Sequence, residues 1–174
     1  CPAQLLRNLI HFCSRDAMDI EGLGPAIIET FVNVGMINKT YDIYNLNPDK
    51  IASLEGFKQT SAKNIINSVN NSKKNDLSKL IFALGIRHIG AKAGKLLADH
   101  FKNIDAIMNA SVDDILEIDG FGVVMAQSVV EFFESDSSKE LIEKLKEVGV
   151  NMISTNVVKD NRFEGMTFVL TGTL

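Results

Sequence analysis

Cysteine is scarce in this sequence, and long apolar runs are absent. The two cysteines, Cys1 and Cys13, cannot form a disulfide framework, which is typical of a cytoplasmic protein. No run of about 18 or more apolar residues occurs, so neither a membrane span nor a membrane partner is predicted. The first residues also lack the basic and apolar segments of a signal peptide. We therefore expect a cytoplasmic protein, and a start at Cys1 in place of methionine indicates a fragment.

Catalytic signatures are absent as well. The sequence has no Walker loop, no Ser-His-Asp set and no Lys-x-Asp-Gly motif, and its three histidines are not spaced as metal ligands. At 174 residues the chain is long enough to bury a core without disulfides or metals. The sequence therefore predicts a globular segment with no catalytic residue of its own.

The net charge of -4 is unevenly distributed. Residues 1–105 carry 13 Lys+Arg against 10 Asp+Glu, whereas residues 106–174 carry 5 against 12. Because phosphate binding depends on local clusters of charge, the negative total does not exclude a nucleic-acid partner. Charge alone leaves a second interpretation open, in which a solvated acidic tail follows a neutral body.

A short pattern recurs four times along the chain. It consists of an apolar residue, a spacer, Gly, an apolar residue, and then Gly or a substitute. The copies occupy residues 20–24, 54–58, 86–90 and 118–122, so the third position recurs at intervals of 34, 32 and 32 residues. His88 replaces glycine at the third position of one copy, and Lys58 replaces it at the fifth position of another.

Amphipathic helix patterns flank every copy. After the first copy, for example, Ile27, Ile28 and Phe31 follow the spacing of one helix face. Shorter helical patterns precede each copy, and nothing before residue 166 predicts a strand. We therefore expect an all-α fold in which four hairpins of helices occupy residues 14–150. The hairpins should pair as two units, the first with the second and the third with the fourth.

The glycines of these turns suit an anion site. A tight turn needs a positive φ that glycine adopts freely, and the next helix begins with unpaired N–H groups at its positive end. A phosphate is held well there. Capping alone explains one such turn, but four copies favour phosphate binding. The expected binding residues are the turns and the basic side chains near the second and third turns: Gly22, Gly24, Gly56, Lys58, Lys63, Arg87, His88, Gly90, Lys92, Lys95, Gly120 and Gly122.

Two of these residues carry a further expectation. His88 has a second interpretation as a residue that adopts the left-handed conformation of the turn without contacting a ligand. Valine in place of Gly90 is expected both to disfavour the backbone of the turn and to block a phosphate.

Three segments together resemble one enzyme family. The repeats over about residues 14–135 resemble the helix-hairpin-helix family, and residues 11–24 and 84–90 are similar to two hairpin segments of bacterial NAD-dependent DNA ligases. Residues 163–174 resemble the start of the BRCT domain that follows in those ligases. The resemblance implies four parts: the end of a zinc finger with a lead-in helix at 1–13, the hairpins at 14–150, a linker at 151–162, and a truncated BRCT domain at 163–174.

The resemblance also implies a function. This segment would grip nicked duplex DNA through backbone phosphates, independently of sequence, for an enzyme that seals nicks in DNA replication and repair. The remaining ligase domains would be its partners in cis. NAD, magnesium and zinc are implied for the parent enzyme, and no cofactor is implied for this segment. The Lys-x-Asp-Gly motif that carries AMP in the family is missing, so we expect no activity here.

The cysteines and the tail complete the family-based expectations. Cys1 matches the last ligand of the zinc finger, and with three ligands missing we expect no bound zinc. Cys13 is expected to be a small buried hydrophobe. Residues 166–171 have strong β character without sheet partners, so the tail from about residue 156 is expected to extend away and mediate self-association.

Two other classes of function remain open on the sequence. One is a helix-hairpin-helix module of another DNA repair protein, a glycosylase or a nuclease. A glycosylase needs a catalytic aspartate after its hairpin, and Asp136 follows the fourth copy, but four repeats and a BRCT-like tail do not fit that class. The other class is a protein-interaction scaffold, which would show no salt-dependent retention on duplex DNA.

Overall fold

The computed structural model describes residues 2–155, which are built from helices without a named strand. Cys1, most of the expected linker, the BRCT-like segment and the tail therefore lie outside the described residues. In chain order, the elements are α1 (Pro2–Cys13), α2 (Pro25–Asn33), the 3-10 helix η1 (Thr40–Asn45), α3 (Pro48–Ser53), α4 (Gln59–Ser72), α5 (Leu77–Ala83), α6 (Ala91–Phe101), α7 (Ile104–Met108), α8 (Val112–Leu116), α9 (Val123–Glu134) and α10 (Asp136–Glu147).

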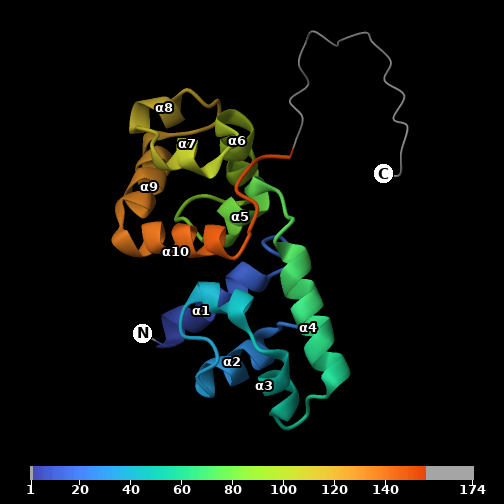
Figure 1. Ribbon diagram of the computed structural model, residues 1–174. Helices are drawn as coiled ribbons and strands as arrows, with labels where there is room; N and C mark the ends of the chain where they lie inside the picture. The colour runs from blue at the N-terminus through green and yellow to red at the C-terminus, as the bar shows by residue number, and fades with distance from the viewer. Residues whose placement is uncertain (1, 156–174) are drawn as a thin grey trace, which may run out of the picture.

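The helices form the four hairpins that the repeat predicts. The hairpins are α1 with α2, α3 with α4, α5 with α6, and α8 with α9, and each pair packs closely. Figure 1 shows two groups, which we call the first unit (α1 to α4) and the second unit (α5 to α10). The all-α fold with four hairpins is confirmed for the described residues.

The pairing of hairpins within each unit is visible in side-chain contacts. In the first unit, the Phe31 ring on α2 lies 5.7 Å from the Phe57 ring in the second turn. A Cβ on Gly22 in the first turn would lie 3.1 Å from Ile65 on α4. In the second unit, a Cβ on Gly120 would lie 3.9 Å from Leu96 on α6. The first hairpin therefore packs on the second, and the third on the fourth.

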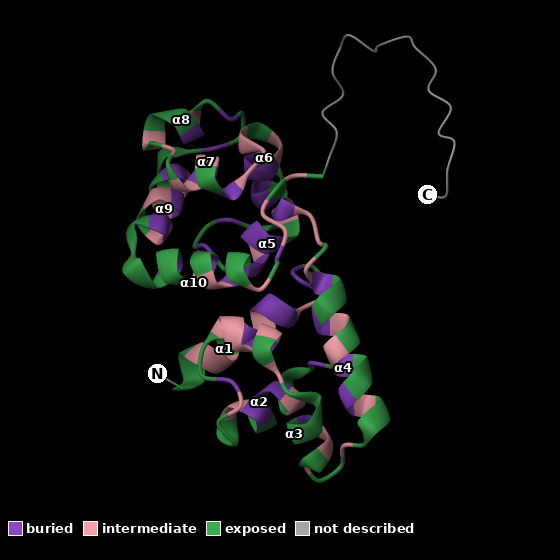
Figure 2. Cartoon of the chain, viewed as in Figure 1, coloured by how far each residue is buried: buried purple, intermediate pink, exposed green. Residues whose placement is uncertain are grey.

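The apolar residues of the helical patterns form one continuous core. Phe12, Phe31 and Leu97 are at most 1% exposed, and buried residues run along the inner sides of the helices in Figure 2. Cys13 is buried too, and this burial raises the pKa of its thiol to about 12. The thiol therefore stays protonated at neutral pH and packs as a hydrophobe.

Asp76 makes a polar contact between the start of α5 and the last described residue. Its carboxylate accepts hydrogen bonds from the Ser78 amide at 2.9 Å and from the Thr155 amide and hydroxyl at 2.5 and 2.8 Å. Partial burial raises the pKa of this carboxyl, but the hydrogen bonds outweigh burial and lower the pKa to about 2. The ionised form is therefore the one that the folded protein stabilises.

This carboxylate predicts a loss of stability in acid. Since the folded pKa lies below the unfolded pKa of about 3.9, the contribution is complete above pH of about 4 and falls as the pH drops toward 2. Asp76→Asn should lower the urea midpoint at pH 7 and flatten its decline between about pH 4.5 and 2. Urea titrations across that range measure both effects. An equal acid-induced decline in the variant and the wild type would contradict the assignment to Asp76.

Candidate nucleic-acid interface

All four turns share one backbone hydrogen bond. In each, the amide of the fourth residue donates to the carbonyl of the first. The donor and acceptor pairs are Leu23 to Ile20 at 3.3 Å, Phe57 to Leu54 at 3.1 Å, Ile89 to Ile86 at 3.1 Å, and Phe121 to Ile118 at 3.2 Å. The repeat in the sequence is thus a repeat of the same closed turn.

The third residue of every turn has a positive φ. The angles are 90° at Gly22, 88° at Gly56, 69° at His88 and 95° at Gly120. His88 therefore adopts the left-handed conformation that its second interpretation required, in a region where histidine is more frequent than most side chains. His88 is exposed, and a contact between its ring and a ligand stays a prediction.

The fifth residue of every turn is the N-cap of the next helix and has an ordinary extended conformation. Its φ is -76° at Gly24, -120° at Lys58, -88° at Gly90 and -95° at Gly122. A Cβ on any of the three glycines would meet nothing within 4 Å. The expectation that valine at Gly90 disfavours the turn's backbone is therefore wrong, because only the third position needs a left-handed residue. The blocking of a ligand stays a prediction.

These four N-caps differ from the other helix starts. The helices α3, α5, α7, α8 and α10 have N-caps whose side chains accept a backbone hydrogen bond: Asn47, Asp76, Asn103, Ser111 and Ser135. The helices α2, α4, α6 and α9, which follow the turns, have no side-chain cap. The four helices that follow a turn thus begin without a side-chain cap, whereas the five helices named above begin with one.

The first amides of these helices are open to an external acceptor. The first intrahelical bonds run from Ile28, Ala62, Gly94 and Ala126 to the carbonyl of the respective N-cap, at 2.9–3.0 Å. The amides before them therefore precede the helical ladder. Pro25 removes one such donor from the first hairpin. The turn and basic residues predicted to bind are all exposed in the structure.

Positive charge is concentrated beside the second and third turns. Lys58 and Lys63 belong to the second hairpin, whereas Arg87, Lys92 and Lys95 belong to the third. The ion pairs Lys144–Glu147 and Lys146–Asp105 include none of these five. All five basic residues are exposed.

The first and fourth turns are followed by apolar residues instead. Pro25 and Ala26 follow Gly24. Val123 and Val124 follow Gly122 and are 53% and 59% exposed. Each unit therefore contains one turn with basic neighbours and one without.

The structure also shows one basic residue near the third turn that the sequence pattern did not indicate. Lys79 on α5 and Lys95 on α6 line one surface cleft together with Ala91, the first residue of α6. Two carboxylates, Asp16 and Asp76, also line this cleft, so its charge is mixed, and Lys79 adds a basic residue of α5 beside Lys95. Because Lys79 lies seven residues before the turn, only the packing of α5 on α6 reveals that it is close to Lys95.

Other kinds of site find no support among the described residues. No group of three or more His, Cys, Asp or Glu side chains within residues 2–155 could hold a metal ion. No helix in that range is long and apolar enough to cross a membrane. Asp136, the aspartate considered for a glycosylase, is exposed in the first turn of α10 beside the Ser135 cap.

Two family models match the chain, and each covers most of one unit. Residues 14–71 match the SAM-like helix-hairpin-helix tandem, and residues 79–142 match the helix-hairpin-helix motif. The boundary between the matches falls at the junction between α4 and α5. The matched ranges contain all four turns.

Curated relatives match over the whole chain. A protein named DNA ligase from Acetivibrio thermocellus is 49% identical over 178 residues, which cover all of this chain and 27% of that protein. Proteins of the same name from Thermoanaerobacter pseudethanolicus and Clostridioides difficile are 49% and 48% identical, and this chain covers 26% of each. The chain thus spans about a quarter of the length of these relatives.

Proposed function

We propose, from the premise that this chain belongs with the helix-hairpin-helix segment of the DNA ligase family, that it grips duplex DNA for such an enzyme. The grip is on backbone phosphates and is independent of base sequence. The observation that carries the proposal is the contrast in capping: four exposed helix N-termini after the turns lack a side-chain cap, while five other helices have one.

The chemistry of these N-termini suits a phosphate. Unpaired amides and the positive end of the helix dipole both stabilise an anion. The glycine N-caps allow a phosphate oxygen to approach the amides, since no Cβ stands in the way. Lys58, Lys63, Arg87, Lys92 and Lys95 add charge beside two of the four turns. Contacts of this kind position a duplex without reading its bases.

The finer parts of the proposal concern the whole enzyme. The substrate is nicked duplex DNA, and the segment binds it from the minor-groove side. Sealing of the nick serves DNA replication and repair. NAD, magnesium and zinc belong to other domains in cis, and no residue of 2–155 is assigned to them. With no Lys-x-Asp-Gly motif in its sequence, this segment has no lysine to carry AMP and supplies binding alone.

The proposal predicts salt-dependent binding. About three to five phosphate contacts give a slope of log K against log salt of roughly -3 to -4.5. A filter-binding titration on a 20-base-pair nicked duplex at several salt concentrations measures the slope. Two duplexes of unrelated sequence should bind with dissociation constants within about twofold of each other.

The control compares two exposed lysines. Lys92→Ala should reduce the slope by about 0.9, because one phosphate contact is lost. Lys139→Ala, on α10 and outside the turns, should leave the slope unchanged. A salt-insensitive complex, or equal effects of the two variants, would count against phosphate gripping by the turns. Absence of binding at low salt would favour the scaffold interpretation.

A further inference from the structure

The residues after α10 lie against the segment that joins the two units. We call residues 151–155 the strap. On the second unit, the Met152 carbonyl accepts a hydrogen bond from the Ile104 amide at 3.0 Å, and the Ser154 amide donates to the Lys102 carbonyl at 2.7 Å. Ile153 also pairs with Asn103 in an isolated antiparallel bridge. The strap is thus fixed to the loop between α6 and α7.

The strap is equally well fixed to the segment that joins the units. The Asn151 amide donates to the Lys73 carbonyl at 2.8 Å, and the Asn151 side chain donates to the Asn75 carbonyl at 3.0 Å. Further along, the strap bonds to the start of α5 in the second unit: the Ile153 carbonyl accepts from the Leu77 amide at 3.3 Å, and Thr155 donates to Asp76, the N-cap of α5. In Figure 1 the last coloured residues accordingly run beside α5.

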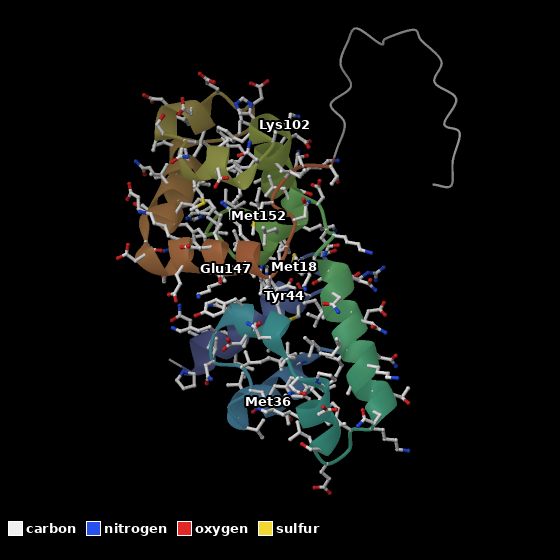
Figure 3. All side chains as sticks on the ribbon, in the orientation of Figure 1. Met18, Met36, Tyr44, Lys102, Glu147 and Met152 are labelled. Carbon is white, nitrogen blue, oxygen red and sulfur yellow. The ribbon has the colours of Figure 1, made fainter. Side chains whose placement is uncertain are left out.

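A last hydrogen bond continues this network into the first unit. The side chain of Asn75 donates to the Met18 carbonyl at 2.7 Å, in the loop between α1 and α2. Figure 3 labels Met18, Met152 and Lys102, which follow one another across the junction. Hydrogen bonds therefore run without interruption from the second unit through the strap to the first hairpin.

We propose that the strap is a positioning device, which holds the two units in a fixed relation so that turns of both contact one duplex. The inference rests on the proposed function. The units also contact each other directly. One hydrogen bond joins the His11 ring to the Phe82 carbonyl at 2.6 Å, and another joins Tyr41 to Glu140 at 3.3 Å. The strap differs from these direct contacts because it bonds to the joining segment, which in turn bonds to the first unit.

A fixed relation between the units should raise affinity for DNA, because both units then bind the same duplex. When one unit is bound, the second meets DNA at an effective concentration set by how well its position is fixed. Loosening the strap lowers that effective concentration without removing a DNA contact. The effect is confined to duplexes long enough for both units, because a short duplex engages one unit only.

Duplex length therefore separates positioning from binding. A unit of about seventy residues has a radius of gyration near 11 Å and a diameter of about 28 Å. This diameter corresponds to about 8 base pairs at roughly 3.4 Å each. The probes are an 8-base-pair stem closed by a short linker and a 20-base-pair duplex. The quantity measured is the dissociation constant for the short stem divided by that for the 20-base-pair duplex, so a loss of affinity for the longer duplex lowers this ratio.

The test variant is Asn151→Ala with Thr155→Val, which removes the side-chain donors of the strap but none of the predicted DNA contacts. We expect affinity for the 20-base-pair duplex to fall about fivefold to tenfold, and affinity for the short stem to change less than about twofold. The control is Ser111→Ala, which removes the cap of α8 and serves as a destabilised variant with an intact strap. Its ratio should equal that of the wild type.

Each outcome has one meaning. A folded double variant with the wild-type ratio overturns the inference, as does a wild type without preference for the longer duplex. Failure of the wild type to bind either probe overturns the proposed function instead. If the double variant does not fold, Asn151→Ala alone is measured, because its side chain donates to the Asn75 carbonyl in the joining segment. It should lower the ratio by about twofold to threefold, and an unchanged ratio in that variant overturns the inference.

Discussion

Gly22→Val is expected to lower the free energy of unfolding by about 2–4 kcal/mol, because the first turn cannot accept a branched side chain. Gly22 has a φ of 90°, in the left-handed region where valine is strained by about 1–3 kcal/mol. Its new Cβ would also lie 3.1 Å from Ile65, a buried residue on α4. Urea unfolding measures the loss, and the melting temperature should fall by roughly 5–15 °C.

The matched control lies two residues further along the chain. Gly24 has a φ of -76° and ψ of 172°, and a Cβ there meets nothing within 4 Å. Gly24→Val should therefore lower the free energy of unfolding by about 0.5–1 kcal/mol, because valine is a poorer N-cap than glycine, and thus by less than Gly22→Val. Equal losses in the two variants would show that the turn has no position-specific demand for glycine. A difference in the expected direction would assign the demand to the third position.

Sequence periodicity was enough to predict the hairpins but not every short helix. The repeat interval and the apolar spacing specify α2, α4, α6 and α9, since each presents a long amphipathic pattern after a turn. The 3-10 helix η1 and the short helices α7 and α8 were expected only as helical stretches before the turns. Their five or six residues are too few for periodicity to separate one short helix from the next.

The strap could not be predicted because its partners are remote. The sequence analysis placed residues 151–155 in a linker, since no apolar periodicity marks them. Their hydrogen bonds go mainly to backbone groups some 50 to 80 residues earlier, and backbone groups have no sequence signature. Asn151 and Asp76 are ordinary loop residues when seen alone. Their roles depend on the packing that brings the two loops together.

The two glycine positions of a turn also look identical in sequence but differ in the structure. At the third position the backbone angle requires a left-handed residue, and even His88 supplies it. At the fifth position the folded chain makes no such demand, as Lys58 demonstrates with the same extended backbone. Glycine at Gly24, Gly90 and Gly122 therefore has no role in the turn itself. A side chain at these positions would meet no other part of the protein, but it would hinder the approach of a ligand.

Gly90→Val tests that argument on the most basic hairpin. The variant should lower the urea midpoint only slightly: its φ of -88° suits valine and its Cβ occupies open space, although valine is a poorer N-cap than glycine. Its affinity for a 20-base-pair duplex should fall about 10- to 100-fold, since hydrogen bonds from amides to a charged phosphate contribute about 1.5–3 kcal/mol. Lys92→Ala, which leaves the amides free, should cost about threefold to tenfold. Filter binding at two salt concentrations gives both affinities. Wild-type affinity in a folded Gly90→Val variant would place the DNA contact elsewhere, whereas a large loss without loss of stability would place a phosphate at the start of α6.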